Sequence, residues 1–158
     1  MISKAVTIGE KFPYFCLPST RGKETTNSDF VSEYTVVFIY PKDNTSSCTR
    51  EALNFSNELM TFQNLKTSVF GLSKDNIASH EKFIEKHSLE IPLISDVELK
   101  LIKPLNSWVE KSMYGKVYWG VERSTFLLSK DQNILKIWRR VKVNNHVNDV
   151  IEAIKNFN

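Results

Sequence analysis

The residue in this chain with the clearest capacity for chemistry is Cys48, one of two cysteines. It follows a polar stretch, 41–47, which itself follows an apolar run, 35–40, and it begins a helical pattern. A sulfur in the first turn of a helix lies near unpaired N–H groups and the positive end of the helix dipole, and both favour thiolate over thiol. Open α/β sheets also bind ligands at the carboxyl ends of their strands. Cys48 is therefore predicted to be an activated nucleophile in a ligand site.

A lowered pKa is not enough to make Cys48 fast. A fall from ~8.5 to ~6 raises the thiolate fraction at neutral pH about 30-fold, but a Brønsted slope of ~0.4–0.5 lowers nucleophilicity by roughly 10- to 18-fold. A fast reaction therefore needs donors that hold the substrate and stabilise charge on the leaving atom. Thr45 can place its hydroxyl beside the sulfur, and the amides of Ser47 and Cys48 point the same way. A fixed cation would complete the set.

The elements that position Cys48 alternate between strands and helices. Continuous apolar runs predict buried strands, and apolar residues at helical spacing predict amphipathic helices. We expect strands over 12–17, 35–40, 68–72, 91–95, 124–128 and 134–141, and helices over 47–65, 77–87, 96–102 (capped by Asp96) and 147–154. The last two strands form an antiparallel hairpin. This order predicts an α/β, thioredoxin-like fold, with a central mixed β-sheet flanked by helices on both faces.

Composition limits the classes of function. The 158 residues suit one domain, 1–158, and the net charge of +3 is mild. The densest basic run, 138–142, alternates like a strand, so its charges split between two faces and no nucleic-acid partner is expected. No segment is apolar enough for a membrane span, residues 1–9 lack the apolar middle of a secretory signal, and the cysteines lack zinc spacing. We expect a cytoplasmic protein with no cofactor and no metal.

The loop resembles that of a known enzyme family. The run Pro41-Lys-Asp-Asn-Thr45-Ser-Ser-Cys48 is similar to the peroxiredoxin signature of a proline, three residues, a threonine, two residues and the peroxidatic cysteine. The preceding Tyr-Pro-Lys-Asp is most similar to the Q-type peroxiredoxins, also called bacterioferritin comigratory proteins. About 75 residues later, the segment 120–127 resembles the family's segment with the active-site Arg123. The resemblance extends over nearly the whole chain.

The resemblance implies a thiol-dependent peroxidase that reduces hydrogen peroxide and organic hydroperoxides. By position, Cys48 is the peroxidatic nucleophile, Thr45 and Arg123 orient the peroxide and polarise its O–O bond, and Pro41 shields the thiolate. Glu51 would help to fix the arginine, and it is equally interpretable as a dipole partner in the first helical turn. The family also implies a thioredoxin, glutaredoxin or small-thiol reductant, and a monomer or weak homodimer.

The chain departs from the family at two places. Ser46 and Ser47 replace the usual proline and glycine before the cysteine, so the loop conformation can differ. Leu53 occupies the position of the usual resolving cysteine, five residues after the first. The remaining thiol, Cys16, lies in an apolar run, which predicts burial. We therefore expect a one-cysteine cycle with an external thiol, rather than a disulfide with Cys16, whose Cα would have to come within ~7 Å of Cys48.

Other readings of the same residues remain open. The rival enzyme is a cysteine hydrolase with His80, His87 or His146 as its base. The rival from another class is a thioredoxin-fold binding or holdase module without turnover. His80-Glu81 begins like the zinc motif HExxH, but the next histidine is seven residues away, about 10.5 Å along a helix, which is too far to share one zinc ion.

The aromatic residues before Arg123 also have two interpretations. Trp108, Trp119 and Trp138 are predicted to pack in or around the core rather than to form a ligand cage. The pairs 114–115 (Tyr-Gly) and 119–120 (Trp-Gly) are a hypothetical lining of the path by which substrate reaches the cysteine.

Overall fold

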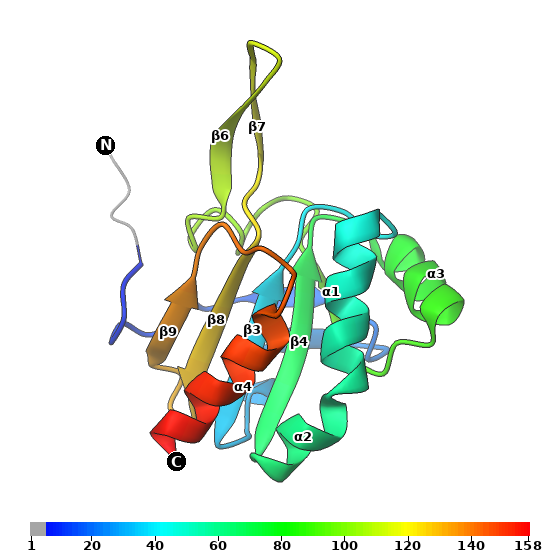
Figure 1. The fold of residues 1–158 in the computed structure, drawn as a ribbon. Coiled ribbons are helices and arrows are strands. Elements are labelled where there is room, and N and C mark those ends of the chain that lie inside the picture. Colours follow the sequence, from blue (N-terminus) through cyan, green and yellow to red (C-terminus); the bar gives the residue numbers. More distant parts are fainter. Residues whose placement is uncertain (1–5) are drawn as a thin grey trace.

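The computed structural model describes residues 6–158 (Figure 1). Residues 1–5, part of the N-terminal stretch considered above, lie outside the described residues. The α-helices are α1 (Ser46–Asn57), α2 (Leu59–Asn64), α3 (Ile77–His87) and α4 (His146–Phe157), and η1 (Asn27–Asp29) is a 3₁₀-helix. The strands are β1 (Cys16–Pro18), β2 (Glu24–Thr26), β3 (Tyr34–Ile39), β4 (Thr67–Ser73), β5 (Leu93–Ser95), β6 (Trp108–Met113), β7 (Lys116–Val121), β8 (Ser124–Ser129) and β9 (Ile134–Trp138). Within residues 6–158, no helix has the length and apolar character that crossing a membrane requires.

A five-stranded mixed sheet organises the chain in the order β5-β4-β3-β8-β9. β3 pairs in parallel with β4, which pairs in parallel with β5. β8 runs antiparallel to both β3 and β9. Its pairing with β9 has a register shift between Leu127 and Leu128. The predicted mixed α/β sheet is confirmed, and β3 lies at its centre, as expected for a strand buried on both faces.

Alternate residues of β3 and its extension point into two separate cores. Phe38 and Tyr40 face the α-helices, and the Phe38 ring stacks on Phe55 of α1 with centroids 4.4 Å apart. Val37 and Ile39 face the other core. This core also contains Phe30 beside η1, residues of the N-terminal segment and residues of the turns over 97–106. The stacking contact sets where α1, and with it Cys48, rests on the sheet.

Two predicted helices differ from the structure. The pattern over 47–65 forms two helices because the chain turns at Glu58, which caps the end of α1 and the start of α2. The segment 96–102 forms helical turns instead of a regular helix because Leu99 has a φ of 61°. Asp96 still acts as a cap, since its carboxylate accepts hydrogen bonds from the amides of three residues: Lys100, Leu101 and Ile102.

A hairpin of β6 and β7 was not predicted. It projects from the end of the sheet (Figure 1), and its two strands pair in register from Trp108↔Val121 to Met113↔Lys116. Trp108 and Trp138 pack partly buried against the two cores, as predicted, whereas Trp119 is 57% exposed. The hairpin places aromatic side chains immediately before Arg123.

Candidate active site

Cys48 lies in the first turn of α1, directly beyond the carboxyl end of β3. The amide of Thr49 donates to the carbonyl of Thr45, which occupies the N-cap position of the helix. Cys48 is only 1% exposed because the side chain packs into the core between the sheet and α1. The sulfur therefore lies near the unpaired amides of the helix start in an environment of low polarity.

Arg123, in the short connection between β7 and β8, reaches Cys48 from 75 residues away. Its Nη2 donates to the Cys48 Sγ over 3.3 Å, and its Nη1 donates to the Glu51 Oε1 over 2.6 Å. The amide of Val141 donates to the Arg123 carbonyl and holds the backbone in place. The planar guanidinium can serve both partners at once, which a lysine ammonium at the end of a flexible stem does not reproduce.

Glu51 is a fully buried carboxyl group one turn after Cys48. Burial raises its pKa to about 7, against the opposing pull of the Arg123 charge. Burial alone would lower the pKa of Arg123, but the charges of Glu51 and Cys48 outweigh it and raise that pKa. A positive charge is thus kept within hydrogen-bond distance of the sulfur.

Glu51 should make the free energy of unfolding fall as the pH rises. Its folded-state pKa of about 7 lies above its usual value of 4.5. Its stabilising contribution is therefore fully present below the unfolded pKa and is lost as the pH rises through about 7. The loss is at most on the order of 3 kcal/mol. We expect urea unfolding of a Cys48→Ser background to show it between about pH 5 and about pH 8. Adding Glu51→Gln should remove this dependence of the free energy of unfolding on pH. If the dependence is unchanged, it arises from other groups.

Thr45 and Pro41 lie in the loop before the helix. The Thr45 hydroxyl donates to the Lys42 carbonyl over 3.0 Å and does not cap the helix. Because the hydroxyl proton is used in this bond, the Thr45 oxygen is left as an acceptor for a substrate O–H group. Pro41 is half-buried two residues after the end of β3, and Thr45 is exposed.

Cys16 is exposed, which corrects the prediction that it is buried. The apolar run 12–17 does contribute Phe12, Phe15 and Leu17 to a core, but Cys16 points the other way because side chains alternate along β1. Its thiol donates to the Glu24 carboxylate over 2.8 Å, and this bond raises the pKa of Cys16. Cys16 is thus held as the less reactive thiol form.

The three histidines have partners other than Cys48. His146 bonds to Thr125 over 2.8 Å, and burial lowers its pKa to about 4. His87 lies 3.1 Å from the Asn44 side chain, and His80 is buried against Asp43. These contacts do not provide the cysteine–histidine pair that the hydrolase reading requires.

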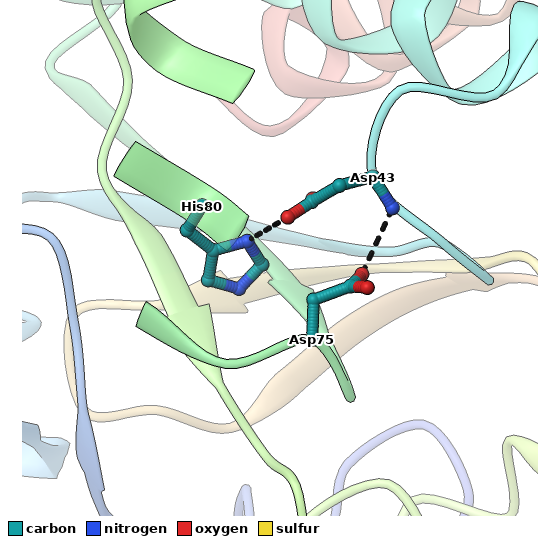
Figure 2. Close-up of side chains that lie close together, drawn as sticks. All are labelled: Asp43, Asp75 and His80. Carbon is teal, nitrogen blue, oxygen red and sulfur yellow. Dashed lines mark hydrogen bonds and ion pairs between the residues drawn. The ribbon is translucent and has the colours of Figure 1, made fainter. Parts of the chain in front are cut away.

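Sequence reasoning missed a buried polar cluster beneath the loop. Asp43, Asp75 and His80 place one ligand-type atom each within 4.8 Å of one another (Figure 2). Both ring nitrogens of His80 are engaged, one by Asp43 over 2.8 Å and the other by the Ile94 carbonyl over 3.0 Å. The available signal was the polar Asp43 in the loop that follows a buried strand; the sequence indicates His80 only as a candidate hydrolase base and as part of a zinc motif.

Comparison with known proteins places this geometry in a family. The family model described as AhpC/TSA matches residues 8–137. The chain belongs to the AhpC/TSA family. Peroxiredoxin Bcp of Bacillus subtilis is 39% identical over 150 residues, covering 95% of this chain and 96% of the relative. Peroxiredoxin Bcp of Xanthomonas campestris is 39% identical over 134 residues, covering 85% and 84%.

Solved structures agree with this assignment. A peroxiredoxin Q of Xylella fastidiosa superposes with a TM-score of 0.91 at 33% identity, covering 98% of each chain. The bacterioferritin comigratory protein of Xanthomonas campestris, trapped with an intermediate or ligand in work on its alkyl peroxide reduction, superposes with a TM-score of 0.86 at 36% identity, covering 90% and 91%. This AhpC/TSA-family chain is accordingly a peroxiredoxin with a thioredoxin-like fold, and it reduces peroxides with the help of a thiol.

Proposed function

We propose that Cys48 is the peroxidatic nucleophile and that it works by a one-cysteine cycle. The Cys48 thiolate attacks the terminal oxygen of the hydroperoxide, the O–O bond breaks, and the leaving oxygen takes a proton to become water or an alcohol. Cys48 is left as a sulfenic acid. The observation that carries this proposal is the Arg123 guanidinium shared between the Cys48 Sγ at 3.3 Å and Glu51 at 2.6 Å.

Each neighbour of Cys48 has a role in this step. The Arg123 charge stabilises the thiolate before attack and the negative charge that grows on the leaving oxygen during it. Thr45, left as an acceptor, orients the peroxide through its O–H group. Pro41, half-buried in the same loop, shields the sulfur from water. These groups supply the transition-state contacts that a low thiol pKa cannot provide.

The second half of the cycle uses an external thiol. One thiol condenses with the sulfenic acid and releases water, and a second thiol reduces the resulting mixed disulfide. Leu53 occupies the usual resolving position, and Cys16 is held by Glu24 as a thiol. Thioredoxin, glutaredoxin or a small thiol such as glutathione fits this requirement, and the reducing cytoplasm, where we place the protein, contains all three. We infer a monomer or weak homodimer.

Cys16→Ser should leave turnover unchanged. The reduced wild type and the variant should consume hydrogen peroxide at equal rates, and both should accumulate a mass increase of one oxygen on Cys48 that a sulfenic-acid reagent traps. Stopped-flow kinetics and mass spectrometry measure these outcomes. If the wild type forms an internal disulfide and Cys16→Ser blocks its turnover with a disulfide-exchanging donor, Cys16 resolves and the one-cysteine cycle is wrong.

The hairpin of β6 and β7 offers a contact for bulky hydroperoxides. A groove of about 560 Å³ runs between the hairpin and the active-site arginine, and its lining includes Val109, Lys111, Tyr118, Arg123, Arg140 and Val141. Tyr118 is 42% exposed, whereas Tyr114 is 98% exposed at the hairpin tip. Tyr118 rather than Tyr114 or Trp119 is the aromatic residue that shares this groove with Arg123.

Tyr118→Ala should lower the rate with a bulky organic hydroperoxide about 3- to 10-fold, through lost apolar contact, and leave the rate with hydrogen peroxide unchanged. Tyr114→Ala is the matched control, because it removes the same side chain from the same hairpin outside the groove. Competition kinetics with the two peroxides measure the ratio. Equal ratios for the two variants would exclude Tyr118 from substrate recognition.

A further inference from the structure

The loop that leads into Cys48 has one buried side chain. Between Tyr40 and Cys48, only Asp43 is buried, at 7% exposure; Pro41 is half-buried, and the other five residues are exposed. The stretch 44–47 contains neither glycine nor proline, and Asn44 adopts a φ of 62°. Little apolar packing or covalent restriction therefore defines this loop. Its conformation depends on how Asp43 is held.

Asp43 is held through both its side chain and its backbone (Figure 2). Its Oδ1 accepts from the Tyr40 hydroxyl over 2.6 Å, and its Oδ2 accepts from Ser79 and from the His80 Nδ1, each over 2.8 Å. Its amide donates to the Asp75 Oδ2 over 2.8 Å. These contacts tie the loop to the end of β3, the segment after β4, and helix α3.

The hydrogen bonds join Asp43 and His80 in a buried pair. The His80 Nε2 faces the Ile94 carbonyl, which can only accept, so this nitrogen carries a proton. The other ring nitrogen, Nδ1, faces the Asp43 Oδ2, which also accepts from Ser79, while the Tyr40 hydroxyl donates to Oδ1. Burial alone would raise the pKa of Asp43, but its bonds to His80, Tyr40 and Ser79 lower it overall. Both partners are buried, and loss of one partner of a buried pair is much worse than loss of one partner of an exposed pair.

Asp43 is adjacent to the groups that orient the catalytic loop. The Lys42 carbonyl, which accepts the Thr45 hydroxyl, belongs to the peptide group whose nitrogen is the anchored Asp43 amide. Fixing this peptide fixes the acceptor of Thr45 and, through the next turn, the start of α1 that bears Cys48. A displacement of about 1 Å in such a site can lower a rate about 100-fold.

We propose that Asp43 is a positioning residue for peroxide reduction: clamped by Tyr40, Ser79 and His80, it holds the loop so that Thr45, the helix amides and Arg123 converge on one peroxide at Cys48. The inference rests on the proposed role of Cys48. Asp43 touches neither the sulfur nor the substrate, and it acts through the conformation of the loop.

The test uses two reagents that make opposite demands on the loop. Peroxide needs the aligned donors, whereas iodoacetamide needs only access to the sulfur, which is 1% exposed. Asp43→Asn leaves the clamp with an amide N–H₂ facing hydrogen-bond donors and removes the charge opposite His80. We expect the peroxide rate of Cys48 to fall about 10- to 100-fold while its alkylation rate rises several-fold. Hydrogen exchange of the amides in 43–48 should speed up.

Asp96→Asn is the matched control. Asp96 is also a buried carboxylate that accepts three hydrogen bonds, but these come from the turns over 97–106. Its loss should lower stability without separating the peroxide rate from the alkylation rate. If Asp43→Asn changes the two rates in the same proportion as Asp96→Asn, Asp43 is merely structural and the inference is wrong.

Two further measurements keep the result decisive. Ser79→Ala removes one bond to Asp43 and retains the contact between Asp43 and His80, so it serves if Asp43→Asn does not fold. We expect about a threefold fall in the ratio of the peroxide rate to the alkylation rate. In a double-mutant cycle, the variant that combines Asp43→Asn with His80→Gln should have a peroxide rate no lower than that of Asp43→Asn alone, because Asp43 and His80 act as one unit. A wild type that consumes no peroxide would overturn the proposed function, whereas alkylation and exchange would still decide the role of Asp43.

Discussion

Cys48→Ser is expected to lower the rate of peroxide reduction by at least about 1,000-fold. A serine hydroxyl is not ionised near neutral pH and cannot be oxidised to a sulfenic acid, so neither the attack nor the intermediate survives. The measurement is consumption of hydrogen peroxide and of an organic hydroperoxide by the reduced protein in excess thiol. The same assay separates a peroxidase from a thioredoxin-fold module that binds without turnover.

Cys16→Ser provides the control for this result, because it makes the same atomic change at the exposed cysteine. It should retain the wild-type rate. Serine nearly preserves the shape of the buried side chain, so the Cys48→Ser protein should remain folded, which far-UV circular dichroism and urea unfolding can verify. Peroxide consumption equal to that of the wild type would show that the sulfur of Cys48 is not the nucleophile.

Arg123→Lys should lower the second-order rate of peroxide reduction about 100- to 1,000-fold, the range for removing a donor aimed at developing charge. Lysine retains the positive charge, but its ammonium cannot present the two parallel donors that reach Cys48 and Glu51. Stopped-flow kinetics measure the rate.

Arg21→Lys is the matched control for Arg123→Lys. Arg21 also forms an ion pair, with Asp29 at 3.0 Å, but in the segment that carries β2 and η1. This partly exposed pair contributes little to stability, so the variant should behave as the wild type. If Arg123→Lys were as fast as Arg21→Lys, a charge near the sulfur would suffice and the forked geometry would be irrelevant.

Arg123 and Glu51 form a coupled pair beside the sulfur. Near pH 7 the Glu51 carboxyl is close to its own pKa, so this partner of the guanidinium loses its negative charge as the pH falls. This explains why a carboxylate can be buried beside a nucleophile without suppressing it. It also means that the pH profile of the rate describes the group of residues and not Cys48 alone.

Local patterns in the sequence contained much of the fold and the reacting group. The apolar run of β3, the amphipathic α3 and α4, and the hairpin of β8 and β9 all follow from periodicity, because burial of one face repeats at a fixed spacing. The position of Cys48 follows for the same reason. A strand, a polar loop and a helix in succession place the loop at the end of the sheet and the cysteine at the helix start.

Periodicity and spacing do not show which distant groups meet; the family resemblance implies that Arg123 acts at Cys48, and the tertiary structure gives the physical reason. Arg123 joins Glu51 and Cys48 because β8 pairs antiparallel with β3, which brings residues 75 positions apart to the same end of the sheet. Asp43 meets His80 because α3 packs back toward the loop. Cys16 is exposed although its neighbours are apolar, because the face of β1 that points to the core is fixed only when β1 pairs with β2. Local sequence specifies elements and their buried faces, whereas contacts across the chain depend on how the sheet is ordered, and they complete the active site.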